Sequence, residues 1–136
     1  MLRQSLLAGL SLCVTFTMMS CSSSHERARS IDFASQTLHL AVGESAVMTD
    51  EGFSPGIGDS WSLVIAPDER VATIDEHLRN CAQPGCTGQL DETITAVGPG
   101  TTTIELRYCF RSAPPNCQPQ PGETLAEPVT VVVEVA

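Results

Sequence analysis

The chain has 136 residues, 42% of them hydrophobic, which suffices for one domain with a single buried core. Seven Arg and no Lys stand against sixteen Asp and Glu, giving a formal net charge of −9. Nothing in such a chain could neutralise a run of phosphates, which argues against a nucleic-acid-binding protein.

The first twenty residues have the composition of an export signal. They contain one basic residue, Arg3, an apolar stretch at 6–19, and a small residue, Ser20, before Cys21. The sequence Met-Met-Ser-Cys at 18–21 resembles a bacterial lipoprotein cleavage box, which implies that Cys21 becomes the lipid-bearing first residue. The alternative is cleavage by the ordinary signal peptidase. Lipidation would make the chain an exported, membrane-anchored protein of the cell envelope, with 21–35 as a tether and 36–136 as the domain.

From Gln36 onward the dominant hydrophobic period is two, which indicates an all-β domain. Leu38, Leu40 and Val42 are expected on the inward face of the first strand, and Trp61 in the core. The polar segment 75–88 is expected to be a loop with one helical turn at 76–80. Seven short strands about ten residues apart predict a Greek-key sandwich. The expected strands are 37–42, 46–49, 61–65, 70–74, 90–97, 101–109 and 129–135.

Four cysteines remain when Cys13 in the signal and Cys21 are set aside. An exported chain of this kind is expected to form two disulfides, for which three connectivities exist. The two local pairings are favoured because each pair flanks a Pro-containing turn. A zinc site is the rival, but the spacings suit it poorly, so no metal and no cofactor are expected. The four are Cys81, Cys86, Cys109 and Cys117.

The segment Ser-Pro-Gly-Ile-Gly-Asp-Ser-Trp at 54–61 and the later Tyr108 carry a further likeness. Through them, residues 38–135 resemble the chagasin family of cysteine-protease inhibitors. The first-loop motif of that family, Asn-Pro-Thr-Thr-Gly-Tyr-x-Trp, keeps its Pro, Gly and Trp here at Pro55, Gly58 and Trp61, and its third loop begins at Tyr108. The resemblance implies a seven-stranded immunoglobulin-like sandwich whose three end loops enter the cleft of papain-like proteases. The residues it assigns to the first two loops are Ser54, Pro55, Gly56, Ile57, Gly58, Gly85, Thr87 and Gly88.

The nine residues CFRSAPPNC at 109–117 resemble the reactive loop of Bowman–Birk trypsin inhibitors. That loop is a disulfide-closed ring with a basic residue, then Ser, then a variable residue, then Pro-Pro. The resemblance implies that Arg111 is presented on an extended backbone to a trypsin-like protease, with Arg111-Ser112 as the exposed peptide bond. It also implies a cis bond before the first proline. The remaining ring residues are Phe110, Ala113, Pro114 and Pro115.

Catalytic side chains are not apparent, because no nucleophile has a base spaced to assist it. Adjacent acids such as Asp91 and Glu92 are expected at solvated strand edges, since neighbouring strand residues point to opposite faces. His39 is expected on an outward strand face. The sequence therefore predicts a non-enzymatic peptidase inhibitor whose partner is a serine or cysteine protease. The alternative is a non-inhibitory envelope lipoprotein with a structural or adhesive role.

Overall fold

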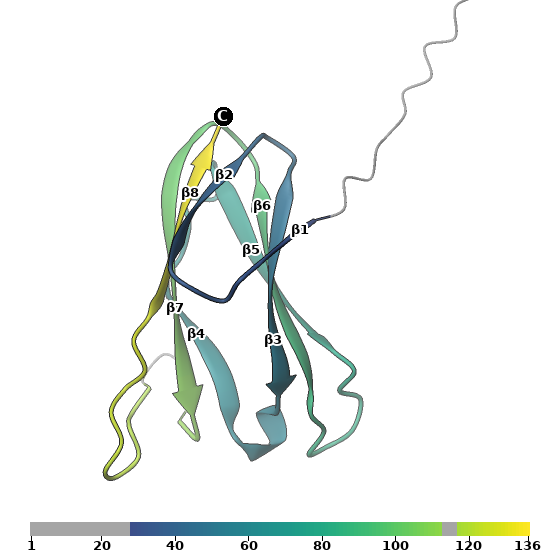
Figure 1. Ribbon diagram of the computed structural model, residues 1–136, viewed down its shortest axis with the longest axis vertical. Coiled ribbons are helices and arrows are strands. Elements are labelled where there is room, and N and C mark those ends of the chain that lie inside the picture. The colour runs from purple at the N-terminus through teal and green to yellow at the C-terminus, as the bar shows by residue number, and fades with distance from the viewer. Residues whose placement is uncertain (1–27, 113–116) are drawn as a thin grey trace, which may run out of the picture.

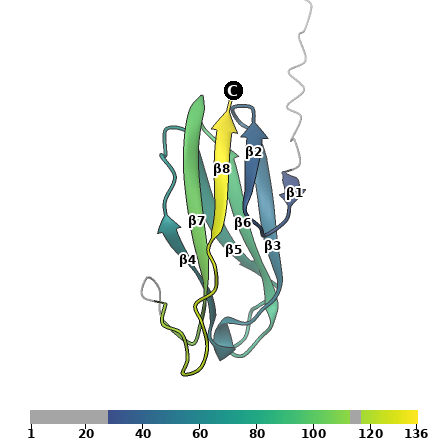
Figure 2. The ribbon, with the colours of Figure 1, turned by 60° about the vertical axis from the view of Figure 1, so that its left-hand side comes forward.

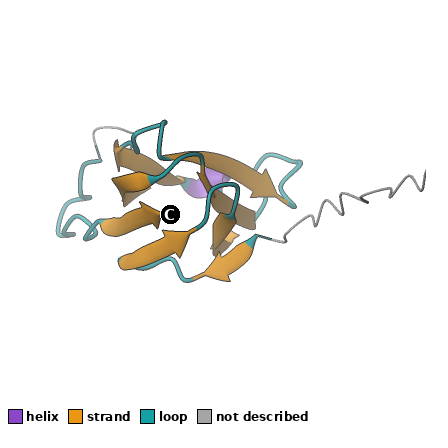
Figure 3. Cartoon of the chain, turned by 90° about the horizontal axis from the view of Figure 1, so that it is seen from above, coloured by secondary structure: helices purple, strands orange, loops and turns teal. Residues whose placement is uncertain are grey.

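Eight strands form two four-stranded sheets in the computed structural model, which describes residues 28–112 and 117–136 (Figure 1). The expected export signal, the lipidated Cys21, and Ala113, Pro114 and Pro115 with the expected cis bond all lie outside the described residues. The sheets pack face to face, so the view from above shows two layers of strands (Figure 3). This is the immunoglobulin-like all-β sandwich that the sequence predicted.

The strand order is β1-β3-β6-β5 in one sheet and β2-β8-β7-β4 in the other. Strand β1 pairs parallel to β3 and β2 pairs parallel to β8, whereas the other neighbours are antiparallel. The strands are β1 Arg29–Ile31, β2 Gln36–Leu40, β3 Ser45–Phe53, β4 Asp59–Ile65, β5 Ala72–Arg79, β6 Gly88–Ala96, β7 Gly100–Phe110 and β8 Val129–Val135, and a 3-10 turn η1 spans Pro55–Ile57.

The core follows from the alternation of apolar residues along the strands. Leu38 and Leu40 of β2 are buried, as are Ile104 of β7 and Val131 and Val133 of β8. Residues two apart on a strand share a face, so these side chains meet between the sheets. The apolar composition of β8 suited an interior strand, and β8 does lie between β2 and β7.

Three boundaries differ from the expected ones because pairing with a neighbour overrides local composition. Strand β1 lies within the segment expected to be a tether, and its pairing with β3 adds Arg29–Ile31 to the folded domain. The expected helical turn at 76–80 is wrong, since β5 continues to Arg79, paired with Gln89. Val42 is 53% exposed rather than inward, because β2 ends at Leu40 before the turn.

Three connections gather at one end of the sandwich, drawn at the bottom of Figure 1. They join β3 to β4, β5 to β6, and β7 to β8 (Figure 1). The last of them is the longest, and its described residues 117–128 extend beyond the start of β8 in the turned view (Figure 2). Among the described residues, no helix is long and apolar enough to cross a membrane.

Candidate functional site

The first loop, residues 54–58, turns tightly at the end of β3. Pro55 occupies the start of η1, where its fixed φ suits a helical turn, and Gly58 ends it with a φ of 113°. The carboxylate of Asp59 accepts a hydrogen bond from the backbone N–H of Ser54 at 2.8 Å. Ile57 projects from this turn with 56% of its surface exposed. The loop thus presents one apolar side chain on a short, well-fixed backbone.

The second loop, residues 80–87, is closed by a disulfide between Cys81 and Cys86, whose Cα atoms are 5.3 Å apart. Gly85 follows the turn with a φ of 77°. This pairing is the local connectivity favoured from the sequence, and the structure confirms it. The ring fixes the loop in its position beside the first loop.

The first and second loops touch through backbone and hydroxyl groups. A Cβ added to Gly56 would lie 2.7 Å from the Cα of Gly85, so only glycine permits this approach. The hydroxyls of Ser54 and Thr87 share a hydrogen bond of 2.7 Å. Gly88, also assigned to the site, begins β6 opposite Phe53 and is buried. These contacts join the two loops into one surface.

The third loop begins at Phe110 and is closed by the second expected disulfide, Cys109 to Cys117, with Cα atoms 5.4 Å apart. The backbone N–H of Arg111 donates to the carbonyl of Gly58 at 2.8 Å, and its Nε donates to the carbonyl of Ile57 at 3.4 Å. Its guanidinium lies 5.0 Å from the centre of the Phe110 ring. Arg111 therefore connects the third loop to the first.

The expected extended backbone at Arg111 is wrong. Its φ is 51°, in the left-handed region that non-glycine residues seldom adopt. Arg111 also packs closely on the first loop, since a Cβ on Gly58 would lie 2.7 Å from the Cγ of Arg111. Ser112 accepts a hydrogen bond from the backbone N–H of Gln118 at 3.2 Å. A groove of about 600 Å³ lies between the end of β7 and residues 117–127.

A polar network supports the first loop from within the sandwich. The Tyr108 hydroxyl donates to Asp59 at 2.6 Å, and the indole N–H of Trp61 donates to Asp50 at 2.9 Å. Burial and the neighbouring Asp59 carboxylate raise the pKa of Tyr108 to about 12. Trp61 is half-buried and packs against Phe33, with ring centres 4.3 Å apart. No pattern in the sequence points to the two aspartates, because only the folded sheets bring them to these donors.

Glu92 lies in the interior, contrary to the expectation of a solvated acid. Its side chain is 4% exposed, on the same face of β6 as Leu90 and Ile94. Desolvation, and then the charges of Glu76 and Asp75, raise the pKa of Glu92 to about 7. The expectation fails for Glu92 but holds for the preceding residue, Asp91, which faces outward and pairs with Arg79. Glu92 lines a separate hollow between the two sheets and is not part of the loop site.

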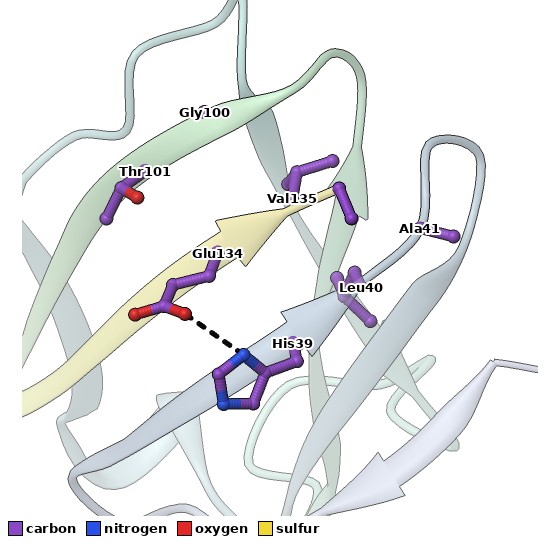
Figure 4. Close-up of a pocket in the computed structure, with 8 residues that line it drawn as sticks. His39, Leu40, Ala41, Gly100, Thr101, Glu134 and Val135 are labelled. Atoms are coloured by element: carbon purple, nitrogen blue, oxygen red, sulfur yellow. Dashed lines mark ion pairs between the residues drawn. The ribbon is translucent and has the colours of Figure 1, made fainter.

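A second hollow of about 510 Å³ lies at the opposite end of the sandwich (Figure 4). His39 and Glu134, on the adjacent strands β2 and β8, form an ion pair there with Nδ1 3.1 Å from Oε2. Both side chains are largely exposed, so this pair contributes little to stability. The outward position expected for His39 is confirmed. The hollow brings together one imidazole, one carboxylate and several apolar residues from the neighbouring chain segments.

The loop site carries little charge. Its residues, 53–58, 80–88 and 109–112, include no histidine and one cation, Arg111. Ser54 and Thr87 satisfy each other's hydroxyls, leaving Ile57 as the exposed apolar side chain of the first loop. Among the described residues there is no group of three His, Cys, Asp or Glu side chains placed to hold a metal ion.

No family model matches the sequence, and no curated protein matches it. Solved structures resemble the fold. The crystal structure of the cysteine protease inhibitor EhICP2 from Entamoeba histolytica aligns with 80% of this chain and 95% of that chain, at 18% identity and a TM-score of 0.56. The solution structure of amebosin aligns with 81% of this chain and 99% of that chain, at 22% identity and a TM-score of 0.55.

A third structure, PbICP-C in complex with falcipain-2, aligns with 79% of this chain and 98% of that chain. Its identity is 14% and its TM-score 0.46, too low to support an argument. The first two alignments cover most of this chain and nearly all of each of the other two chains. They confirm, at the level of the fold, the resemblance expected from the sequence.

Proposed function

We propose that this chain inhibits papain-like cysteine proteases by inserting its three-loop end into their active-site cleft. The observation that carries the proposal is that the loops are joined tip to tip. Gly56 contacts Gly85, Ser54 bonds to Thr87, and Arg111 bonds to the carbonyls of Ile57 and Gly58. The result is one continuous edge rather than three independent loops.

Rigidity is what such an inhibitor requires. An edge held by two disulfides and by bonds between loops loses little conformational entropy on binding, so more of the contact energy appears as affinity. Ile57 at the tip offers an apolar group for a protease subsite. The likeness to EhICP2, which is described as a cysteine protease inhibitor, supports this use of the fold.

Trypsin-like proteases, which would be inhibited through Arg111, are the less favoured target class. Such a protease takes a basic residue from an extended backbone, whereas Arg111 has a φ of 51°. The Arg111 side chain is also engaged, through Nε with Ile57 and through its guanidinium with Phe110. In the proposed mode Arg111 braces the first loop and is not the residue that enters a specificity pocket.

We also propose that the protein is exported and anchored by a lipid on Cys21. The support is the composition of residues 1–20 and the lipoprotein-like sequence at 18–21. Expression in a bacterium with radiolabelled palmitate tests this directly. Label in the membrane fraction that disappears in the Cys21→Ser variant is the expected result. Unlabelled, fully soluble wild-type protein would contradict the anchor.

The inhibitory function is tested by titrating the chain that begins at Ser22 against papain and against trypsin, with fluorogenic peptide substrates. We expect stoichiometric loss of papain activity and undiminished trypsin activity. Arg111→Ala distinguishes the target classes. Trypsin inhibition abolished by this substitution would establish the alternative target, and failure to inhibit either enzyme would favour a structural or adhesive envelope protein.

A further inference from the structure

A groove runs along the side of the sandwich where strands β4 and β5 face each other. Each is the last strand of its sheet, so neither has a neighbour on its outer side among the described residues. Two hollows, of about 230 and 130 Å³, lie between them. Both are lined by Leu63 of β4 and Ile74 of β5, so they lie next to each other along this side. This side is separate from the three-loop end.

The smaller hollow has an unpaired carboxyl group at its base. Glu92 is 4% exposed, and no hydrogen bond formed by the described residues satisfies its side chain. Glu76 stands directly opposite Glu92 in the pairing of β5 with β6, so both side chains point to the same face. Two carboxylates so placed repel each other unless a proton or a cation lies between them.

The rest of the groove suits an apolar chain with a positive group. Trp61 lines the same hollow as Glu92, and a tryptophan ring can bind a cation on its face. Glu69 and Asp75 line the larger hollow, so the rim is also acidic. The groove combines acidic groups, an aromatic wall and an apolar floor.

Strand β4 carries an apolar edge beside the groove. Leu63, Val64 and Ile65 are 43%, 45% and 43% exposed, an unusual run of three consecutive large apolar residues on a free strand. The free edge offers backbone N–H and C=O groups that an added strand could pair with. A second copy of this chain would bring another net charge of −9 to the acidic rim, which disfavours self-association there.

We infer that this groove binds an extended segment of a partner protein, which pairs with β4 and inserts an arginine or lysine side chain beside Glu92 and Glu76. The inserted cation relieves the repulsion between the two carboxylates. A charge pair shielded from water is stronger than one on the surface. Apolar residues flanking the cation cover the exposed side chains of β4.

Binding is measured with a blocked peptide, Val-Thr-Arg-Thr-Val, and a control peptide with citrulline in place of arginine. Trp61 is the chain's one tryptophan, so its fluorescence reports occupancy of this hollow. We expect a saturable change with the arginine peptide and at least tenfold weaker binding of the citrulline peptide, which has nearly the same shape without the charge.

Protein variants show whether the buried acid is responsible. Glu92→Gln and Glu76→Gln should each weaken the arginine peptide at least tenfold. Glu127→Gln, at an exposed position that lines neither of these two hollows, removes the same charge and should leave the affinity within twofold. Thermal unfolding shows whether each variant is folded. If Glu92→Gln does not fold, the affinity of Glu76→Gln for the arginine peptide tests the inference instead. Equal binding of the two peptides, no saturable binding, or wild-type affinity in folded glutamine variants would overturn the inference.

Discussion

The carboxylate of Asp59 accepts the Tyr108 hydroxyl at 2.6 Å through one oxygen and the backbone N–H of Ser54 at 2.8 Å through the other. One side chain thus links β7 to the first residue of the loop before β4. The position of the first loop is set from inside the sandwich as well as by its neighbours at the surface.

Replacing Asp59 by Ala should lower the free energy of unfolding by about 2 kcal/mol, because two part-buried donors lose their acceptor. Tyr108→Phe should cost about 1 kcal/mol, because it removes one donor and leaves Asp59 bonded to Ser54. In the double variant the two costs should not add, since both substitutions remove the same bond. Urea denaturation of the four proteins measures this, and additive costs would mean that the Asp59–Tyr108 bond contributes nothing.

Ile57→Asp should weaken papain inhibition by a factor of about 30, corresponding to about 2 kcal/mol for a central apolar contact. Val42→Asp is the matched control, because Val42 is similarly exposed, at 53% against 56%, but lies at the opposite end. Inhibition constants from steady-state kinetics compare the two. Equal effects would mean that the loop end is not the contact surface.

Gly58→Ala should destabilise the fold by about 2 to 3 kcal/mol, because it combines a left-handed backbone with a clash against Arg111. Gly43→Ala has a similar backbone requirement, with a φ of 89°, but nothing lies within 4 Å of the added Cβ. It should cost about 1 kcal/mol. Thermal unfolding of both variants separates the cost of backbone strain from the cost of the clash with Arg111. An equal loss of stability in the two variants would contradict close packing of the first and third loops.

Glu92 should make the protein less stable as pH rises from about 4.5 to about 7. Its folded pKa, about 7, lies above its ordinary value of 4.5, so the folded state holds the proton more tightly. Stability is therefore greatest below that window and is lost as the carboxyl ionises. Glu92→Gln should remove about 2 kcal/mol of this pH dependence, allowing for partial solvation at the hollow.

The opposite trend is expected at lower pH. Arg79 lowers the pKa of Asp91 on the outer face of β6, so the stability from this pair is lost as pH falls through the folded pKa of Asp91. Wild type and Glu92→Gln should share this acid limb and differ only above about pH 4.5. Denaturant titrations across the pH range test both limbs, and parallel curves throughout would contradict an interior, ionisable Glu92.

The period-two pattern was enough to predict the sandwich, because apolar alternation is a property of each strand. Leu38 and Leu40 face the core for that reason, and β8 lies between two neighbours as its valines indicated. The end of β5 was not predictable in this way. Residues 76–79 have a loop-like composition, and they become strand only because β6 pairs with them.

At the loop site, the local disulfide pairs favoured from the sequence are the ones found, but the geometry of the loops was not predictable from it. The close approach of Arg111 to the first loop depends on the missing Cβ of Gly58, more than fifty residues away in the chain. The hydrogen bonds of Asp59 and the burial of Glu92 were likewise not predictable, because the environments of both side chains consist of residues from other strands. Contacts distant in sequence determine how these side chains behave.

Both ends of the described chain leave the sandwich far from the loops. Arg29 pairs with Ala46 near the start of β3, and the backbone N–H of Ala136 bonds to the carbonyl of Leu40 at 3.0 Å. Strand β3 ends where the first loop begins, at the other end of the sheet. A chain attached to a bead, a sensor chip or a bilayer through either terminus would therefore point its loops outward, free to meet an approaching protein.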